Sequence, residues 1–117
     1  GIRLGSELKA KVVSIQDVDK EEIDVLINCS PVGMSPNLEE TPVPSRCLRK
    51  GMIVFDSVYN PLETRLIREA KVAGCVTISG VELFVNQAVG QFELWTGQKA
   101  PTDIMRDVVV RGLEGKL

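Results

Sequence analysis

Residues 52–79, MIVFDSVYNPLETRLIREAKVAGCVTIS, contain the pattern that decides the fold. The apolar runs 52–56 and 76–79 predict two short buried strands. Between them, the Asn-Pro pair at 60–61 predicts the start of a helix, because Asn caps helices and Pro suits the first helical position. Gly74 predicts the end of that helix. The helix would bury one apolar stripe, formed by Leu62, Leu66, Ile67 and Ala70.

The flanking sequence repeats this alternation of strands and helices. Residues 12–15 and 25–28 are two further β-type runs, and residues 80–96 predict a long helix that Gly97 ends. Pro101 opens a last helix that extends to about residue 113. Four apolar strands separated by helices predict an α/β fold with a parallel sheet covered on both faces.

Composition excludes several classes of function. The 14 Lys and Arg residues against 16 Asp and Glu residues give a net charge of -2, so we expect no nucleic-acid partner. No apolar run approaches the length of about 18 residues that spans a membrane, so we expect no membrane partner. Histidine is absent, and Cys29, Cys47 and Cys75 form no CxxC pair, so we expect no metal site. A reducing cytoplasm is the expected location.

Three features carry polar groups to places where ligands bind. Residues 28–34 (NCSPVGM) and residues 56–61 (DSVYNP, with the only tyrosine at Tyr59) each follow a strand, and parallel sheets bind ligands at that edge. Gln87 and Gln91 lie four residues apart on the long helix and could bind a ligand with several hydroxyl groups. Taken alone, each feature also fits a structural role: a capped turn, a packed tyrosine ring and two solvated glutamines.

Four segments in order resemble motifs of the shikimate dehydrogenase family. Residues 28–34 are similar to its Asn-Thr-(Ser/Thr)-Pro-x-Gly-Met loop, and residues 56–61 to its Asp-x-x-Tyr-x-Pro motif. Residues 80–88 (GVELFVNQA) resemble Gly-x-x-Met-Leu-x-x-Gln-Ala, and residues 92–97 (FELWTG) resemble Phe-x-x-Trp-x-Gly. The resemblance extends over about residues 11–112.

The resemblance implies an NADP-dependent enzyme that reduces 3-dehydroshikimate to shikimate in the pathway to chorismate and aromatic amino acids. The chain would be a single incomplete domain, with the distal part of a Rossmann-like NADP-binding sheet at about residues 1–80. The helices at about residues 80–113 would pack toward a substrate domain. That N-terminal domain would precede this chain in the same polypeptide and hold the catalytic Lys–Asp pair, so we expect no catalytic residue here and no turnover by the isolated chain. A homodimer is a further expectation.

The resemblance also implies site residues. Shikimate would contact Tyr59, Gln87 and Gln91, and NADP would contact Cys29, Ser30, Ser57, Gly80 and Leu83. Two departures concern the cofactor side. Cys29 stands where the family has Thr, and Leu83-Phe84 stands where it has Met-Leu.

Several alternatives stay open at this point. The enzyme could use quinate in place of shikimate or NAD in place of NADP, and it could be fused to a dehydroquinate dehydratase, with a plastid location in a plant. A regulatory relative could retain the ligand pocket without the reaction. A complete flavodoxin-like receiver domain is disfavoured, because Asp56 alone does not provide the acidic cluster that such a domain requires.

Overall fold

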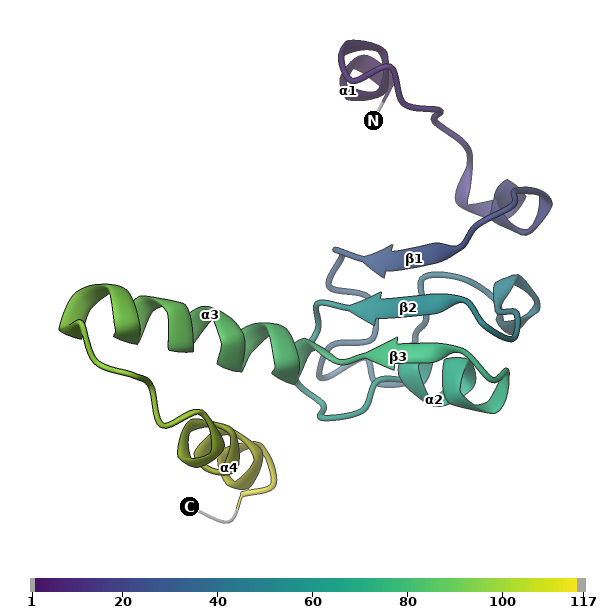
Figure 1. Cartoon of the computed structure of the whole chain (residues 1–117). Coiled ribbons are helices and arrows are strands. Elements are labelled where there is room, and N and C mark those ends of the chain that lie inside the picture. Colours follow the sequence, from purple (N-terminus) through teal and green to yellow (C-terminus); the bar gives the residue numbers. More distant parts are fainter. Residues whose placement is uncertain (1, 116–117) are drawn as a thin grey trace.

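The computed structural model describes residues 2–115, and its elements are labelled in Figure 1. It contains three strands, four α-helices and two 3-10 helices among these residues. In chain order they are α1 (Ile2–Glu7), η1 (Ile15–Lys20), β1 (Val25–Asn28), η2 (Ser45–Cys47), β2 (Ile53–Asp56), α2 (Arg65–Val72), β3 (Val76–Ile78), α3 (Gly80–Thr96) and α4 (Thr102–Leu113).

The strands form one parallel sheet in the order β1-β2-β3. Val25 pairs with Ile53 and Asn28 with Asp56, while Ile53 also pairs with Val76. All three arrows in Figure 1 therefore point to the same edge, from which α3 also extends. The predicted α/β class with a parallel sheet is confirmed.

Of the four predicted strands, the one at residues 12–15 is wrong. Residues 10–14 have no regular structure, and Ile15 begins η1, whose first turn is capped by the Ser14 side chain accepting from the backbone N–H of Gln16. Val12 and Val13 are exposed, at 49% and 37%. Their β-branched side chains favour extended backbone, but among residues 2–115 no neighbouring strand pairs with them.

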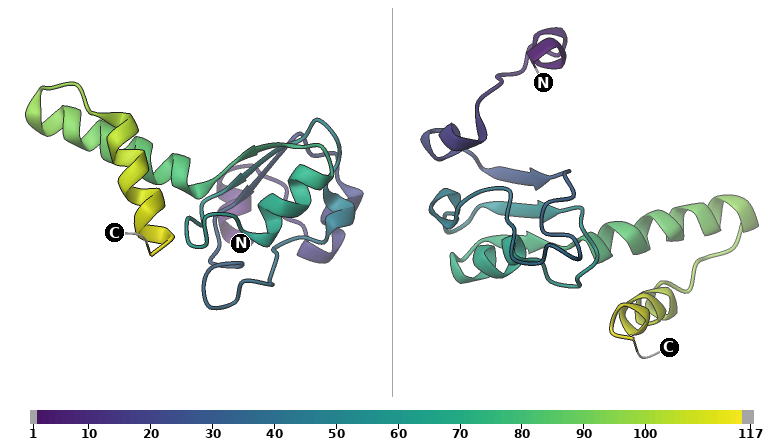
Figure 2. Two further views of the ribbon diagram at one scale, coloured as in Figure 1. Left: turned by 90° about the horizontal axis from the view of Figure 1, so that it is seen from below. Right: turned by 180° about the vertical axis from the view of Figure 1, so that it is seen from behind.

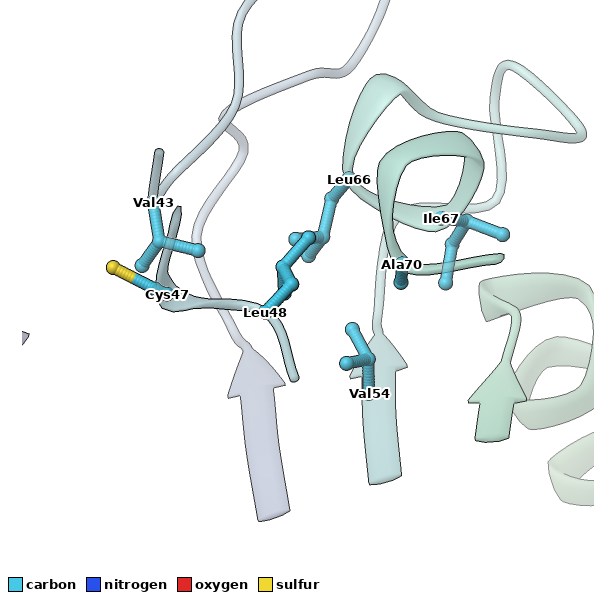
Figure 3. Packing of buried hydrophobic residues seen from close by; sticks show 7 residues of the cluster. All are labelled: Val43, Cys47, Leu48, Val54, Leu66, Ile67 and Ala70. Atoms are coloured by element: carbon cyan, nitrogen blue, oxygen red, sulfur yellow. The ribbon is translucent and has the colours of Figure 1, made fainter. Parts of the chain in front are cut away.

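The core lies between α2 and one face of the sheet. Val54 of β2 is fully buried, and Leu66 and Ala70 of α2 pack above it, as Figure 3 shows. The remaining buried members of this cluster are Val43, Cys47, Leu48 and Ile67. The helix therefore presents the apolar stripe that its sequence predicts, except that Leu62 lies before the helix and is half-buried.

The other face of the sheet is open in the part of the chain that the structure describes. Five of its apolar side chains are 38–58% exposed: Val25, Ile27, Ile53, Val76 and Ile78. The expectation of a sheet covered on both faces is therefore not met by residues 2–115, because α2 is the only helix with extensive contacts to the strands. We name these five side chains the open face.

Helix α2 begins four residues later than predicted. Asn60 and Pro61 are joined by a cis peptide bond and lie before the helix, whose N-cap is Thr64. The Thr64 hydroxyl accepts a hydrogen bond from the backbone N–H of Ile67. Thr64 is 1% exposed, so the cap that the structure uses is also a buried anchor between helix and sheet.

Helices α3 and α4 form an arm that projects from the carboxyl edge of the sheet (Figures 1 and 2). The arm turns at Gly97, whose φ of 64° is left-handed and suits glycine. Arg106 of α4 donates to both carboxylate oxygens of Glu82 on α3. The radius of gyration is 16.5 Å, against about 13 Å for a compact chain of this length, because the arm and α1 stand away from the sheet.

The apolar side chains of α3 are only partly buried. Val81 and Val85 are buried, but Trp95 at its far end is 76% exposed. Each described helix within residues 2–115 is too short or too polar to cross a lipid bilayer.

Candidate functional site

A cleft of about 440 Å³ lies at the carboxyl edge of the sheet. Two loops form it: the first loop, residues 29–35 after β1, and the second loop, residues 57–60 after β2. The lining residues are Cys29, Ser30, Pro31, Met34, Ser35, Ser57, Val58, Tyr59 and Asn60. None of them is acidic or basic by residue type, so the cleft presents hydroxyl, thiol, amide and backbone groups together with apolar surface.

The first loop is shaped by the side chain of Asn28, the last residue of β1. Its amide oxygen accepts from the backbone N–H of Ser30 at 3.0 Å and from the Ser30 hydroxyl at 2.7 Å. Its amide nitrogen donates to the carbonyl of Val32 at 3.2 Å. Asn28 is 4% exposed, so these bonds form away from solvent and fix the turn that carries the cleft residues.

The second loop is tied to the first through Asp56, the last residue of β2. Oδ1 of Asp56 accepts from the Asn28 amide nitrogen and from the backbone N–H of Val58, each at 3.0 Å. Oδ2 accepts from the Thr64 hydroxyl at 2.6 Å. Asp56 is fully buried, and this set of donors satisfies a carboxylate that would be costly to bury alone.

Gly80 brings α3 against the second loop. A Cβ at this position would lie 2.2 Å from the Val58 carbonyl oxygen and 2.7 Å from the Tyr59 backbone nitrogen. Because backbone atoms cannot yield as a flexible side chain does, only glycine permits this approach of the helix start to the cleft.

Tyr59 stands between the cleft and α3. Its ring stacks on Phe84 with centroids 4.7 Å apart and an interplanar angle of 28°. The Tyr59 side chain is 43% exposed, and its hydroxyl makes no hydrogen bond to any residue within 2–115. The phenol is therefore held by its ring and available at its polar end.

The two glutamines lie farther along α3. Gln87 is three residues after Phe84, about one helical turn beyond the Tyr59 ring, and Gln91 is a further turn away. Both are exposed, line no part of the cleft, and are without a hydrogen-bonding partner for their side chains in the described chain. Leu83 is 43% exposed near the start of the helix and is likewise not a lining residue.

The structure thus brings together some of the site residues that the sequence suggests. Cys29, Ser30, Ser57 and Tyr59 line one cleft, and Gly80 abuts its wall. Leu83, Gln87 and Gln91 lie on the helix that extends from that wall.

Sequence reasoning missed Thr64 and the stack on Phe84. Thr64 directly precedes an apolar helical stripe, which is a signal for an N-cap, but nothing local indicates that its hydroxyl meets Asp56. The stack joins two rings that lie 25 residues apart in the chain, and no local pattern indicates such a contact.

An ion pair between Glu82 of α3 and Arg106 of α4 stabilises the arm that carries the glutamines. Arg106 beside Glu82 holds the pKa of that carboxyl below its ordinary value, chiefly through their hydrogen bonds, against an opposing effect of burial. Both side chains are 38% exposed, so solvent screens the attraction and its contribution is small.

Known proteins are similar to this chain in sequence and in structure. A family model described as "Shikimate 5'-dehydrogenase C-terminal domain" matches residues 80–110. A Methanosarcina acetivorans protein named shikimate dehydrogenase (NADP(+)) is 48% identical over 93 residues, which cover 80% of this chain and 33% of that protein. An Arabidopsis thaliana bifunctional 3-dehydroquinate dehydratase/shikimate dehydrogenase, described as chloroplastic, is 43% identical over 106 residues, or 88% of this chain and 18% of that protein.

The structural comparison gives the same result. The crystal structure of a shikimate dehydrogenase in complex with NADP+ superposes with a TM-score of 0.80 and 34% identity, and covers 94% of this chain and 40% of the other. The chain spans about a third of the length of the Methanosarcina relative. Because sequence and structure agree over at least four fifths of its residues, the chain belongs to the shikimate dehydrogenase family.

Proposed function

We propose that this chain is the C-terminal part of an NADP-dependent shikimate dehydrogenase, which reduces 3-dehydroshikimate to shikimate. One observation carries the proposal: the first loop and the second loop meet in a single cleft, and α3 starts against its wall. The names of the relatives support the reaction, since they describe shikimate dehydrogenases that use NADP(+). The pathway role in the synthesis of chorismate and aromatic amino acids follows from that reaction.

The residues of the cleft fit one end of the cofactor. The hydroxyls of Ser30 and Ser57 and the thiol of Cys29 offer hydrogen-bonding groups of the kind that a ribose and a carboxamide require. The chain contains no Gly-x-Gly-x-x-Gly segment, so its own residues would not hold the phosphates. Leu83 and Gly80 would contribute the apolar and close-packed surface beside the nicotinamide ring of the cofactor. The bound cofactor supplies the hydride that is exchanged with the substrate carbon.

The substrate would lie beside α3. The Tyr59 hydroxyl and the Gln87 amide would bind hydroxyl or carboxylate oxygens of shikimate, with Gln91 as a further contact. The stack on Phe84 supports this assignment, because it holds Tyr59 near the turn of the helix that leads to Gln87. Orienting a small ring against the cofactor side of the cleft is the contribution of these residues to the rate.

The remaining parts of the active site would come from an N-terminal substrate domain of the same polypeptide. Residues 1–80 would then be the distal part of the NADP-binding domain, and residues 80–113 would pack toward the substrate domain. Exposed apolar side chains support this arrangement, both on the open face and on the arm at Leu94, Trp95, Ile104 and Val108. The catalytic Lys–Asp pair would reside in that domain, and the enzyme would be a cytoplasmic homodimer, or plastidic in a plant.

The test uses the full-length product of the reading frame that contains this chain. NADP+ is mixed with shikimate or quinate, and NADPH formation is followed by its absorbance. The proposal predicts NADP+ reduction with shikimate, and little with quinate or when NAD+ replaces NADP+. Binding of shikimate without any oxidation would instead favour a regulatory relative and contradict the proposed reaction. The 117-residue chain alone is predicted to be inactive.

A further inference from the structure

We infer that Asn28, Asp56 and Thr64 form a positioning unit that holds the first and second loops at one relative placement and so couples the binding of cofactor to the binding of substrate. The inference rests on the proposed function for the identity of the two ligands. None of the three residues is a ligand contact in that proposal. Their role is to act through the lining residues to which they are bonded.

Asp56 joins the two loops directly. One carboxylate oxygen, Oδ1, accepts from the Asn28 amide nitrogen on the side of the first loop and from the Val58 backbone N–H in the second loop, both at 3.0 Å. A third bond crosses the same junction, since the Ser57 backbone N–H donates to the Asn28 carbonyl at 3.0 Å. A shift of either loop would therefore lengthen bonds that fix the other.

Asn28 links Asp56 by hydrogen bonds to the groups of the first loop that line the cleft. Its amide oxygen holds the Ser30 backbone and hydroxyl, while its amide nitrogen serves both Asp56 and the Val32 carbonyl. The orientation of the Asn28 side chain is thus set by both loops. Because it is 4% exposed, water is not a ready substitute for a lost partner.

Thr64 anchors the carboxylate to the core. Its hydroxyl donates to Oδ2 of Asp56 at 2.6 Å and accepts from the backbone N–H of Ile67 in the first turn of α2. Helix α2 packs on the sheet through Leu66 and Ala70, which are 1% and 0% exposed. The position of Asp56, and through it of both loops, is therefore tied to the buried core between α2 and the sheet.

The kinetic test substitutes Thr64 in the full-length product. Thr64→Val keeps the shape and removes the hydroxyl, Thr64→Ser keeps the hydroxyl, and Ile67→Val is a matched core control expected to cause a similar loss of Tm. We expect Thr64→Val to raise the KM for NADP+ and the KM for shikimate together, each by roughly fivefold, which corresponds to one lost hydrogen bond. Thr64→Ser should restore both KM values, and Ile67→Val should leave both within a factor of about two.

Three results would overturn the inference: Thr64→Val and Ile67→Val giving the same KM values, only one of the two KM values changing, or no recovery in Thr64→Ser. If Thr64→Val does not fold, Asp56→Asn takes its place, because it retains an oxygen for Asn28 and Val58 but loses the acceptor for Thr64. Asp56→Asn is expected to change both KM values in the same direction.

A second measurement separates this inference from the proposed function. Hydrogen exchange is followed in peptides covering residues 28–35 and 57–60, with β2 as the internal reference. In Thr64→Val both loop peptides should exchange about tenfold faster relative to β2, and in Ile67→Val they should not. If the wild-type protein fails to oxidise shikimate, the proposed function falls. The inference of a positioning unit is then supported if the two loops lose protection from hydrogen exchange together in Thr64→Val, and contradicted if they do not.

Discussion

The ring of Tyr59 stacks on the ring of Phe84 with their centroids 4.7 Å apart, and this contact joins the second loop to α3. Tyr59 comes from the carboxyl end of β2, whereas Phe84 belongs to the first turns of the projecting arm. The stack therefore fixes the phenol relative to the helix that carries Gln87. Under the proposed function, substrate recognition by Tyr59 and Gln87 would depend on that placement.

Removing the support should weaken recognition without touching a polar group. We expect Phe84→Ala to raise the KM for shikimate by about 2- to 10-fold, because an aromatic pair contributes about 0.5–1.5 kcal/mol. Phe84→Tyr, which keeps a ring to stack on, should have a smaller effect. Steady-state kinetics of the full-length product measure both. A normal KM in Phe84→Ala would mean that the stack does not position Tyr59.

The polar groups themselves are tested by Tyr59→Phe and Gln87→Ala. Tyr59→Phe keeps the stacking ring and removes only the hydroxyl, and Gln87→Ala removes the side-chain amide. Each variant therefore loses hydrogen bonds to the ligand that are worth about 1 kcal/mol or more. We expect each to weaken shikimate binding by about 5- to 10-fold in calorimetric titration. Gln98→Ala, at an exposed glutamine beyond the end of α3, is the matched control. If neither variant weakens binding, the site assignment is wrong.

Gly80 and Gly90 give a matched pair on one helix. Gly80→Ala would place Cβ 2.2 Å from the Val58 carbonyl oxygen, whereas nothing lies within 4 Å of a Cβ at Gly90. Gly80→Ala should cost about 1–3 kcal/mol of unfolding free energy and displace the second loop. Gly90→Ala should stabilise α3 by about 0.5–1 kcal/mol. Denaturant unfolding compares them, and an equal response of the two variants would contradict the close approach.

Local signals accounted for much of the fold. Helix α3 has the predicted limits, residues 80–96, because a glycine at its end and an apolar periodicity within it are properties of neighbouring residues. The strands at 25–28, 53–56 and 76–78 follow from short β-branched runs bounded by turns. The lining of the cleft by Cys29, Ser30, Ser57 and Tyr59 follows from the rule that parallel strands end at one edge.

What the sequence could not supply depends on distant partners. Residues 12–15 have strand propensity, but a strand also needs a neighbour, and propensity does not reveal one. Asn60 has the chemistry of an N-cap, yet Thr64 caps the helix because its hydroxyl also reaches the buried Asp56, eight residues earlier in the chain. Such a choice is made by tertiary packing and leaves no periodic signal.

The open face provides a test of the larger protein. Ile27 is 52% exposed, so Ile27→Lys should change the stability of the isolated chain by less than about 0.5 kcal/mol. In the full-length product, where further elements would cover this face, the same change buries a charge at a cost of several kcal/mol. Thermal unfolding of both forms measures the difference. A Tm equally insensitive in both forms would show that nothing covers Ile27.

The ion pair of Glu82 and Arg106 predicts that the stability of the protein depends on pH. Because the folded-state pKa of Glu82 is lowered, its contribution to stability is present above about pH 4.3, the pKa of a free glutamate, and is lost as the pH falls through the lower folded-state value. Glu82→Gln should therefore reduce Tm slightly at pH 7 and have no effect in strong acid. Glu22→Gln, at an exposed glutamate, is the control. A difference that persists unchanged in acid would contradict the pair's role.

The most direct measurement is a crystal structure of the full-length product with shikimate and NADP+ bound. The Tyr59 hydroxyl and the Gln87 amide should both lie within about 3.2 Å of oxygens on one shikimate molecule, with the dinucleotide against Ser30 and Ser57. Shikimate bound away from both side chains, or Tyr59 and Gln87 too far apart to reach the same ring, would contradict the account.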